Sequence, residues 1–325
     1  MNDELFNLKI KEDNTPAKYN ESEISFLNRS TRDIVLKTKE YFNFWFNEFK
    51  KEQLLEESSR MREDILSGND ERYYSAITEL WIYSFLKKQK FTLKAHPNIK
   101  NVRGRPDYLA EKDGGTFYLE VKTIIGSSED LRVKKTKNHI KNMVDELACI
   151  DFYINISFLS IGDDNLKYSL IKKRLKEAIE NLDYELIKSK KMDPPIILIE
   201  EGGWNIKIDF IPVGENARKK RTVKSRNIGV TFDQLEVVKI DKSIKDAIHN
   251  KKKYKGVKKP FLLVINVINK GIFLDDIDIM DALFGNMQYT LKENSNDLKF
   301  SRKNNGASVN KKKGVVNKTL VVFGL

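Results

Sequence analysis

Two acidic residues and a lysine lie in a pattern that suits chemistry at a bound metal ion. Glu120 and Lys122 flank Val121, and because side chains alternate along a strand, they would share one face while Val121 points the other way. Asp107 precedes them by a stretch that includes Asp-Gly-Gly at 113–115, a turn sequence that would fold the chain into a hairpin. The hairpin would bring the two carboxylates side by side.

Two adjacent carboxylates repel each other unless a cation lies between them, and a hard divalent cation prefers oxygen ligands. We therefore expect Asp107, Glu120 and the main-chain carbonyl of Val121 to bind Mg²⁺, with Mn²⁺ as a substitute. A cation held there would activate water as a nucleophile, and Lys122 would stabilise the charge that develops on an attacked phosphate. The pattern predicts hydrolysis of a phosphate ester.

A third acid is expected in a helix that precedes these strands. Residues 71–90 carry apolar side chains on nearly every side, which is typical of an interior helix, and Glu79 lies among them. A carboxylate is seldom buried without a partner, so Glu79 should reach either the metal or donors from Ser, Tyr or the backbone. We count Glu79 with Asp107, Glu120 and Lys122 as the candidate catalytic residues, and Glu79 also as a candidate metal ligand.

The composition favours a polyanionic partner. Lys and Arg number 59 against 47 Asp and Glu, which gives a formal charge of +12. Nucleic acid, and DNA in particular, is the expected partner. A general bias towards Lys, Asn and Ile is the competing explanation. One cysteine and three scattered histidines argue against a disulfide framework or a multi-cysteine zinc site.

The N-terminus is charged from its first residues, and no apolar stretch is long enough to span a bilayer. We therefore expect a soluble, cytoplasmic protein that has no membrane partner. The sequence is compatible with a homodimer or with a partner protein.

Three groups of basic residues are candidates for contacts with phosphates, which are largely independent of nucleotide sequence. One precedes Asp107, one is expected in a loop between strands, and one ends a helix. A solvated loop explains the second group equally well, and the helix dipole favours cations in the third whatever their function. The nucleic-acid-binding candidates are Arg105, Lys252, Lys253, Lys255, Arg218, Lys219, Lys220 and Arg221.

Hydrophobic periodicity predicts the elements around these residues. Short extended segments are expected at 91–96, 106–111 and 116–123. A helix at 241–256 and a strongly apolar strand at 260–269 follow much later in the chain.

The long stretch between them has elements of its own, including a helix expected at 168–190, and is interpreted as an insertion. The expected parts are a helical N-terminal segment at 1–70, a core at 71–125 and 240–290, an insertion with a basic loop at 126–239, and a C-terminal extension at 291–325.

The dipeptide Pro106-Asp107 and the tripeptide Glu120-Val121-Lys122, in this hairpin context, resemble the motif of the PD-(D/E)xK, or restriction-endonuclease-like, nuclease superfamily. In that family an acidic residue of the preceding core helix often joins the metal site. The resemblance implies a magnesium-dependent endonuclease that acts on DNA.

The family core is a helix, three strands, a helix and a strand. Residues 71–123 followed by 241–269 reproduce that order if 126–239 is an insertion. The resemblance thus implies an α/β fold with a restriction-endonuclease-like core, a helical N-terminal layer and a large α+β insertion.

Two other functions are compatible with the same residues. One is a catalytically inactive nucleic-acid-binding module on this fold, although such relics commonly lack a motif member and here Asp107, Glu120 and Lys122 are all present. The other is a defence nuclease that is directed to RNA or activated by a partner. The sequence has no GxxxxGK[ST] phosphate loop, which argues against an ATP-driven motor within the chain.

Overall fold

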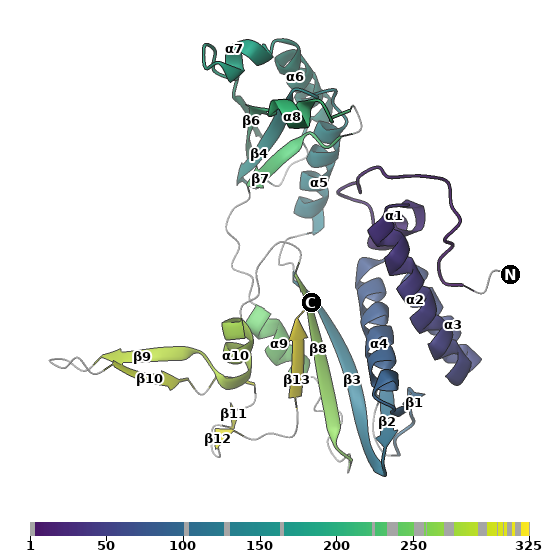
Figure 1. Ribbon diagram of the computed structural model, residues 1–325. Coiled ribbons are helices and arrows are strands. Elements are labelled where there is room, and N and C mark those ends of the chain that lie inside the picture. The colour runs from purple at the N-terminus through teal and green to yellow at the C-terminus, as the bar shows by residue number, and fades with distance from the viewer. Residues whose placement is uncertain are drawn as a thin grey trace. The chain divides into compact units, whose positions relative to one another are not determined.

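The protein is a mixed α/β structure with open sheets, seen in a computed structural model (Figure 1). It divides into two compact units: unit 1 is Met1–Lys11, Ser22–Ser128 and Val238–Leu325, and unit 2 is Glu12–Glu21 and Glu129–Val237. The structure describes residues 4–100, 104–126, 131–162, 166–222, 225–232, 240–249, 257, 259–269, 276–291, 298–303, 305–307, 309–310, 314–315 and 320–324.

Unit 1 begins with a layer of helices. These are α1 (Glu23–Arg29), α2 (Asp33–Glu52), α3 (Leu55–Leu66) and α4 (Asp70–Lys88). The side chain of Asn69 caps α4 by accepting hydrogen bonds from the first free N–H groups of the helix, those of residues 71 and 72. Helices α2 and α3 both pack against α4, whose buried apolar residues form the centre of this layer.

A five-stranded sheet lies under α4, in the order β1-β2-β3-β8-β13. The strands are β1 (Thr92–Ala95), β2 (Tyr108–Lys112), β3 (Gly115–Gly126), β8 (Phe261–Asn269) and β13 (Leu320–Gly324). The first three form antiparallel pairs, whereas β8 is parallel to β3 and β13 is parallel to β8. The hairpin predicted around the Asp-Gly-Gly turn is confirmed as β2–β3, and the predicted C-terminal extension contributes an edge strand.

The two faces of this sheet are covered by different helices. Leu119 of β3 and Val264 of β8 pack in the core beneath α4. Ile124 and Leu263, from the alternate positions of the same strands, pack with Ile244 of α9 (Ile240–His249). Because side chains alternate along a strand, α4 and α9 lie on opposite faces.

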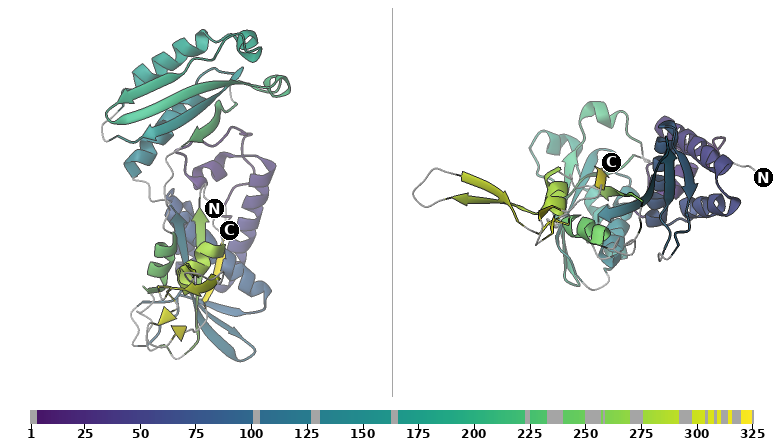
Figure 2. Two further views of the ribbon diagram at one scale, coloured as in Figure 1. Left: turned by 90° about the vertical axis from the view of Figure 1, so that its left-hand side faces the viewer. Right: turned by 90° about the horizontal axis from the view of Figure 1, so that it is seen from below.

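Further elements of unit 1 follow β8. They are α10 (Asp276–Phe284), β9 (Met287–Leu291), β10 (Leu298–Arg302), β11 (Val309–Asn310) and β12 (Gly314–Val315). Strands β9 and β10 pair antiparallel and form a two-stranded ribbon that projects from the end of α10 (Figure 2).

Unit 2 is built around a four-stranded sheet in the order β5-β6-β4-β7. Its elements are α5 (Leu131–Asp145), β4 (Phe152–Ser160), α6 (Tyr168–Glu180), α7 (Tyr184–Lys188), β5 (Ile197–Glu201), β6 (Trp204–Pro212), α8 (Glu215–Arg218) and β7 (Ile228–Phe232). Alternate residues of β6 are fully buried with residues of α5 and α6, so the helices cover one face of this sheet.

One expected helix is wrong in its extent. The helix predicted for 168–190 ends at Glu180, and a second short helix, α7, starts at Tyr184 after Asp183, whose side chain caps it by accepting from Leu186 N–H. In the described part of the chain, no helix combines the length and apolar character needed to cross a membrane.

Candidate metal centre

The site begins at Asp107, one residue before β2. The β2–β3 register ends with Tyr108 opposite Leu119, so its continuation by one step puts Asp107 beside Glu120. The Asp107 Oδ2 atom accepts a hydrogen bond of 2.6 Å from the N–H of Val121. The carboxylate therefore takes the place that a β2 carbonyl would occupy if the strand continued.

This bond also defines where the Val121 carbonyl lies. In an antiparallel pair, the N–H and C=O of one residue point to the same neighbouring strand. The Val121 carbonyl, a predicted metal ligand, therefore faces the same side of β3 as Asp107, beyond the last paired residue of β2.

Glu120 and Lys122 share the other sheet face with Ile124, whereas Leu119 packs beneath α4. Glu120 is buried, with 8% of its surface exposed, and Lys122 is exposed. The predicted acid and base thus lie on the strand face opposite α4, and among the described residues the converging ligand group holds Glu79 and Asp107 but not Glu120.

Helix α4 places Glu79 over the end of β2. Thr78, its neighbour, is fixed to the sheet by hydrogen bonds from Thr123 Oγ1 at 3.2 Å and Asn266 Nδ2 at 2.8 Å. The phenol of Tyr108 also donates to the Glu79 main-chain carbonyl at 3.3 Å. These bonds fix the register of the helix on the sheet and so the position of the Glu79 carboxylate.

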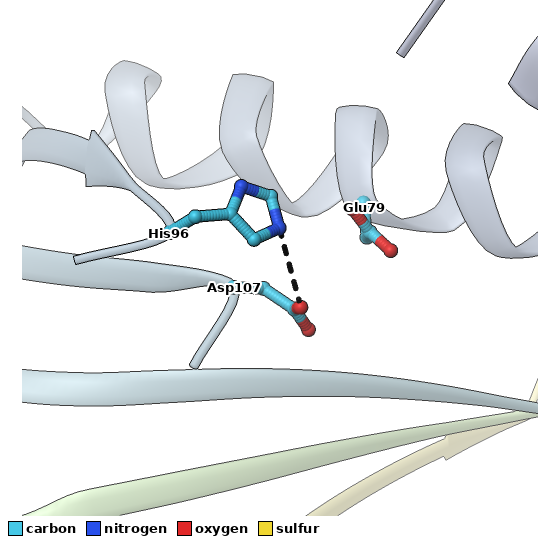
Figure 3. A group of neighbouring side chains, drawn as sticks. All are labelled: Glu79, His96 and Asp107. Carbon is cyan, nitrogen blue, oxygen red and sulfur yellow. Dashed lines mark ion pairs between the residues drawn. The ribbon is translucent and has the colours of Figure 1, made fainter. Parts of the chain in front are cut away.

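A histidine completes the group. His96 follows β1, and its N–H donates to the Asp107 carbonyl at 2.9 Å, which continues the β1–β2 pairing by one residue. One ligand atom each from Glu79, His96 and Asp107 lie within 4.8 Å of one another (Figure 3). The arrangement offers a cation two carboxylates and an imidazole.

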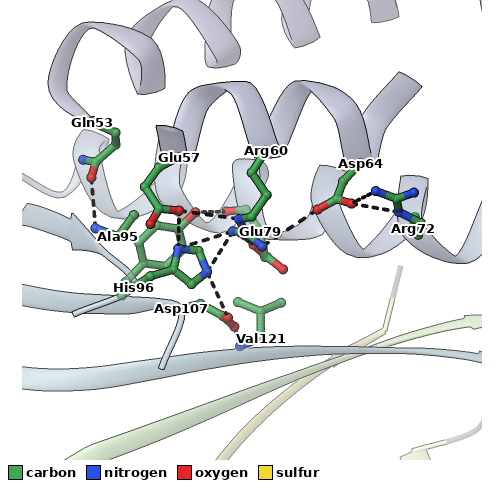
Figure 4. A network of polar contacts seen from close by, with 11 residues as sticks. Gln53, Glu57, Arg60, Asp64, Arg72, Glu79, Ala95, His96, Asp107 and Val121 are labelled. Carbon is green, nitrogen blue, oxygen red and sulfur yellow. Dashed lines mark hydrogen bonds and ion pairs between the residues drawn. The ribbon is translucent and has the colours of Figure 1, made fainter. Parts of the chain in front are cut away.

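Two residues of α3 surround the imidazole (Figure 4). The carboxylate of Glu57 lies 2.8 Å from His96 Nδ1. The Nη2 atom of Arg60 lies 2.8 Å from His96 Nε2 and 3.6 Å from the Glu79 carboxylate. Arg60 is therefore a cation already in contact with two of the three candidate ligands.

A cavity of about 410 Å³ lies beside this cluster and is lined in part by Arg60, His96 and Arg105. Arg105 is exposed at the protein surface next to the cluster. The cavity gives a ligand a route to the imidazole side of the site.

The neighbouring acids raise the proton affinity of Glu79. Burial, followed by the charge of Asp107 and, more weakly, of Glu120, raises the pKa of Glu79 well above its usual range, although Arg60 opposes this. Burial and then Arg60 lower the pKa of His96, against the opposing effect of Glu57. The lowered pKa favours the neutral ring, which is the form that binds metal ions.

The basic candidates of unit 2 have different environments. Arg221 donates to the carbonyls of Ile150, Cys149 and Arg226 at 2.9 to 3.1 Å, so its guanidinium is engaged inside the unit. Arg218 pairs with an aspartate and stacks on the Tyr184 ring at 4.0 Å. Lys219 and Lys220 are exposed and face solvent. Lys252, Lys253 and Lys255 lie outside the described residues.

Sequence reasoning did not identify His96, Glu57 or Arg60. His96 stands at the end of an expected strand, and the only sequence signal for its position was that strand's antiparallel partner, which begins beside Asp107. Glu57 and Arg60 belong to a separate helix, and no spacing in the sequence links them to the hairpin.

Comparisons of the chain with protein-family models, with curated proteins and with solved structures gave no match. The function is therefore argued from the residues and geometry of the site.

Proposed function

We propose that this protein is a divalent-metal-dependent nuclease that hydrolyses phosphodiester bonds, with DNA as its substrate. The observation that carries the proposal is the convergence of Glu79, His96 and Asp107, whose ligand atoms lie within 4.8 Å of one another. Glu120 is the strand neighbour of Asp107, and its charge acts on Glu79.

The donor set fits a divalent cation. Carboxylate oxygens, a main-chain carbonyl and a neutral imidazole are groups that such ions bind in proteins. The pKa of Glu79 is raised because burial and the nearby negative charges disfavour its ionised form. A bound cation would offset that free-energy cost. A cation bound there would act as a Lewis acid on a phosphate and increase the acidity of a water molecule.

The remaining roles belong to exposed cations on the same elements. Lys122 is exposed on the Glu120 face of β3, opposite α4, so its role requires a phosphate at the end of the sheet, where Asp107 lies, to extend to that face; its ammonium group would then stabilise the charge that develops during attack. Arg105, two residues before Asp107, would bind a neighbouring phosphate and hold the backbone of the nucleic acid against the site.

The order of elements supports the same class of enzyme. Helix α4, strands β1 to β3, helix α9 and strand β8 follow the helix, three strands, helix, strand order of a restriction-endonuclease-like core, and unit 2 enters between β3 and α9. Fold resemblance alone does not define a function, so the proposal rests on the site.

The test is cleavage of matched substrates by purified protein. Supercoiled plasmid, linear duplex, single-stranded DNA and RNA are incubated with Mg²⁺, Mn²⁺ or EDTA, with wild type beside Asp107→Asn and Lys122→Ala. Asp113→Asn, the same change in the exposed hairpin turn, and Lys94→Ala, on the exposed side of β1, are the matched controls.

We expect metal-dependent DNA cleavage that both site variants lose and both controls retain. Undiminished cutting by Asp107→Asn would refute the assignment. Salt-sensitive DNA binding without cleavage under any condition would replace the proposal with a non-catalytic binding module. Cleavage of RNA alone would change the proposed substrate from DNA to RNA.

A further inference from the structure

The backbone at His96 is unusual. His96 has φ +43°, the left-handed conformation, which side chains other than glycine rarely adopt and which costs energy. The strain places the imidazole over the Asp107 carboxylate, with Nε2 3.8 Å from Oδ1. A conformation of this kind at a cluster of acids suggests that the position of the ring is selected for a role.

The partners of the ring define its tautomer. A carboxylate only accepts, so Nδ1, 2.8 Å from Glu57, carries the hydrogen. In the neutral ring Nε2 then carries the lone pair, and Arg60 Nη2, 2.8 Å from Nε2 and 3.3 Å from Nδ1, is too close to both nitrogens to lie along it. That lone pair lies on the side of the ring where Asp107 and Glu79 lie.

We propose that His96 is a nitrogen ligand of this metal centre through Nε2, that Glu57 is the positioning residue of its ring, and that the centre therefore selects Mn²⁺ over Mg²⁺. The inference rests on the proposed function for the location of the centre, but it requires no cleavage to be observed.

The carboxylate–histidine pair is the arrangement that orients metal-bound imidazoles in proteins, because the second hydrogen bond fixes both tautomer and ring angle. The side chains of His96 and Glu57 are each only 14% exposed, so their hydrogen bond is protected from water. Mg²⁺ binds oxygen and keeps several waters, whereas Mn²⁺ accepts imidazole readily. A nitrogen ligand thus separates the two ions.

A structural ion-pair network is the alternative explanation for these contacts. In that case His96 serves only to bond Glu57 and to contact Arg60, and a metal bound at the acids takes no nitrogen ligand. The two explanations differ in a measurable property, the presence of a nitrogen nucleus bonded to the ion.

The first measurement is electron spin-echo envelope modulation on the full chain, without a polyhistidine tag, loaded with Mn²⁺. We expect a ¹⁴N coupling that is present in wild type and lost in His96→Asn. Asparagine tolerates the left-handed conformation, so this variant removes the ligand without adding backbone strain. His139→Asn, which changes an exposed histidine of unit 2, should retain the coupling.

Calorimetric titration then tests selectivity and the role of Glu57. His96→Asn should weaken Mn²⁺ binding by more than about tenfold and change Mg²⁺ binding by less than about threefold. Glu57→Ala should weaken Mn²⁺ binding by about 10- to 100-fold, the usual effect of removing such a partner. Glu57→Gln keeps an acceptor for Nδ1 and should retain most of the affinity, and Glu56→Ala, an exposed neighbour, should match wild type.

A Mn²⁺-loaded protein without ¹⁴N coupling, or equal losses of Mn²⁺ and Mg²⁺ affinity in His96→Asn, would overturn the inference. Coupling in a protein that cleaves no substrate would leave the inference standing and remove the proposed nuclease. Cleavage by a Mn²⁺-loaded protein without ¹⁴N coupling would overturn the inference and leave the proposed nuclease standing.

Discussion

Arg60 should oppose metal binding, because its guanidinium occupies the side of the cluster where a cation would lie. Its Nη2 atom is 2.8 Å from His96 Nε2 and 3.6 Å from the Glu79 carboxylate. A transition-metal ion would sit about 2.1 Å from the same nitrogen. The same guanidinium nitrogen is 3.3 Å from Nδ1, so it lies beside the ion's position and not in it, and the repulsion between the two positive charges favours movement of the arginine when metal binds.

The size of the effect follows from the contacts that Arg60 would lose. A hydrogen bond involving a charged group contributes about 1.5 to 3 kcal/mol. The ion pair with Glu79 adds little, since the Arg60 side chain is 42% exposed and exposed pairs contribute about 1 kcal/mol or less. A net cost of about 2 kcal/mol corresponds to roughly 30-fold in affinity. Arg60→Met should therefore bind Mn²⁺ about 30-fold more tightly than wild type does.

The assay is calorimetric titration with Mn²⁺, after circular dichroism has shown that each variant is folded. Arg72→Met is the matched control, because Arg72 pairs with Asp64 at 2.7 Å and its side chain is 54% exposed. Arg72→Met removes one positive charge near the site without changing a contact to a candidate ligand. The affinity of this variant for Mn²⁺ should change less than about threefold. Equal gains in Mn²⁺ affinity in both variants would show that only the loss of a positive charge matters and not the contacts of Arg60. Weaker Mn²⁺ binding in Arg60→Met would refute the reasoning.

Two further predictions concern stability. Because the folded protein binds a proton at Glu79 more readily than the unfolded chain does, the metal-free protein should lose stability as pH rises from about 4.5, the ordinary pKa, to the raised folded value. Glu79→Gln should remove that loss in denaturant titrations across pH in EDTA, and an unchanged slope would contradict the pKa shift. Arg221→Met should lower the free energy of unfolding by about 1 to 2 kcal/mol, because it removes the donor to two partly buried carbonyls. Lys220→Met should leave the free energy of unfolding unchanged and weaken salt-dependent DNA binding. An equal loss of stability in Arg221→Met and Lys220→Met would contradict the structural role of Arg221.

The hairpin could be predicted from the sequence because its signals are local. The Asp-Gly-Gly turn and the alternation around Glu120 involve neighbouring residues. They sufficed to predict a hairpin of 106–111 with 116–123, which the structure shows as antiparallel pairing of 108–112 with 115–119. The pairing then placed Asp107 beside Glu120 without further information. Local chemistry thus predicted the strand part of the candidate site.

The imidazole side of the site depends on tertiary packing. Glu57 and Arg60 reach His96 only because α3 ends up beside α4, and no local pattern encodes that contact. The left-handed backbone at His96 likewise has no signature in the residue itself, since histidine adopts many conformations. Sequence reasoning therefore described an oxygen site, whereas the structure adds a nitrogen.

The break between α2 and α3 has a similar origin. The segment has helical spacing throughout and contains neither Gly nor Pro at the break. Gln53 ends α2, and its side-chain amide bonds to the Leu93 carbonyl and the Ala95 N–H at 2.9 Å each. The amide pairs with the outer edge of β1 as a neighbouring strand would. The helix ends there because the sheet edge needs a partner, which only the folded structure reveals.

The raised pKa of Glu79 supports the proposed cation site, although structural ion-pair networks also perturb pKa values. A nearby arginine by itself would lower the pKa of the acid. Here the pKa is raised although Arg60 lies 3.6 Å away, because burial and the charge of Asp107 outweigh it. The metal-free fold thus keeps the Glu79 carboxylate at a net cost. Shifts of this kind concentrate at functional sites, and a divalent cation among these ligands would reverse the cost, whereas the arginine alone does not.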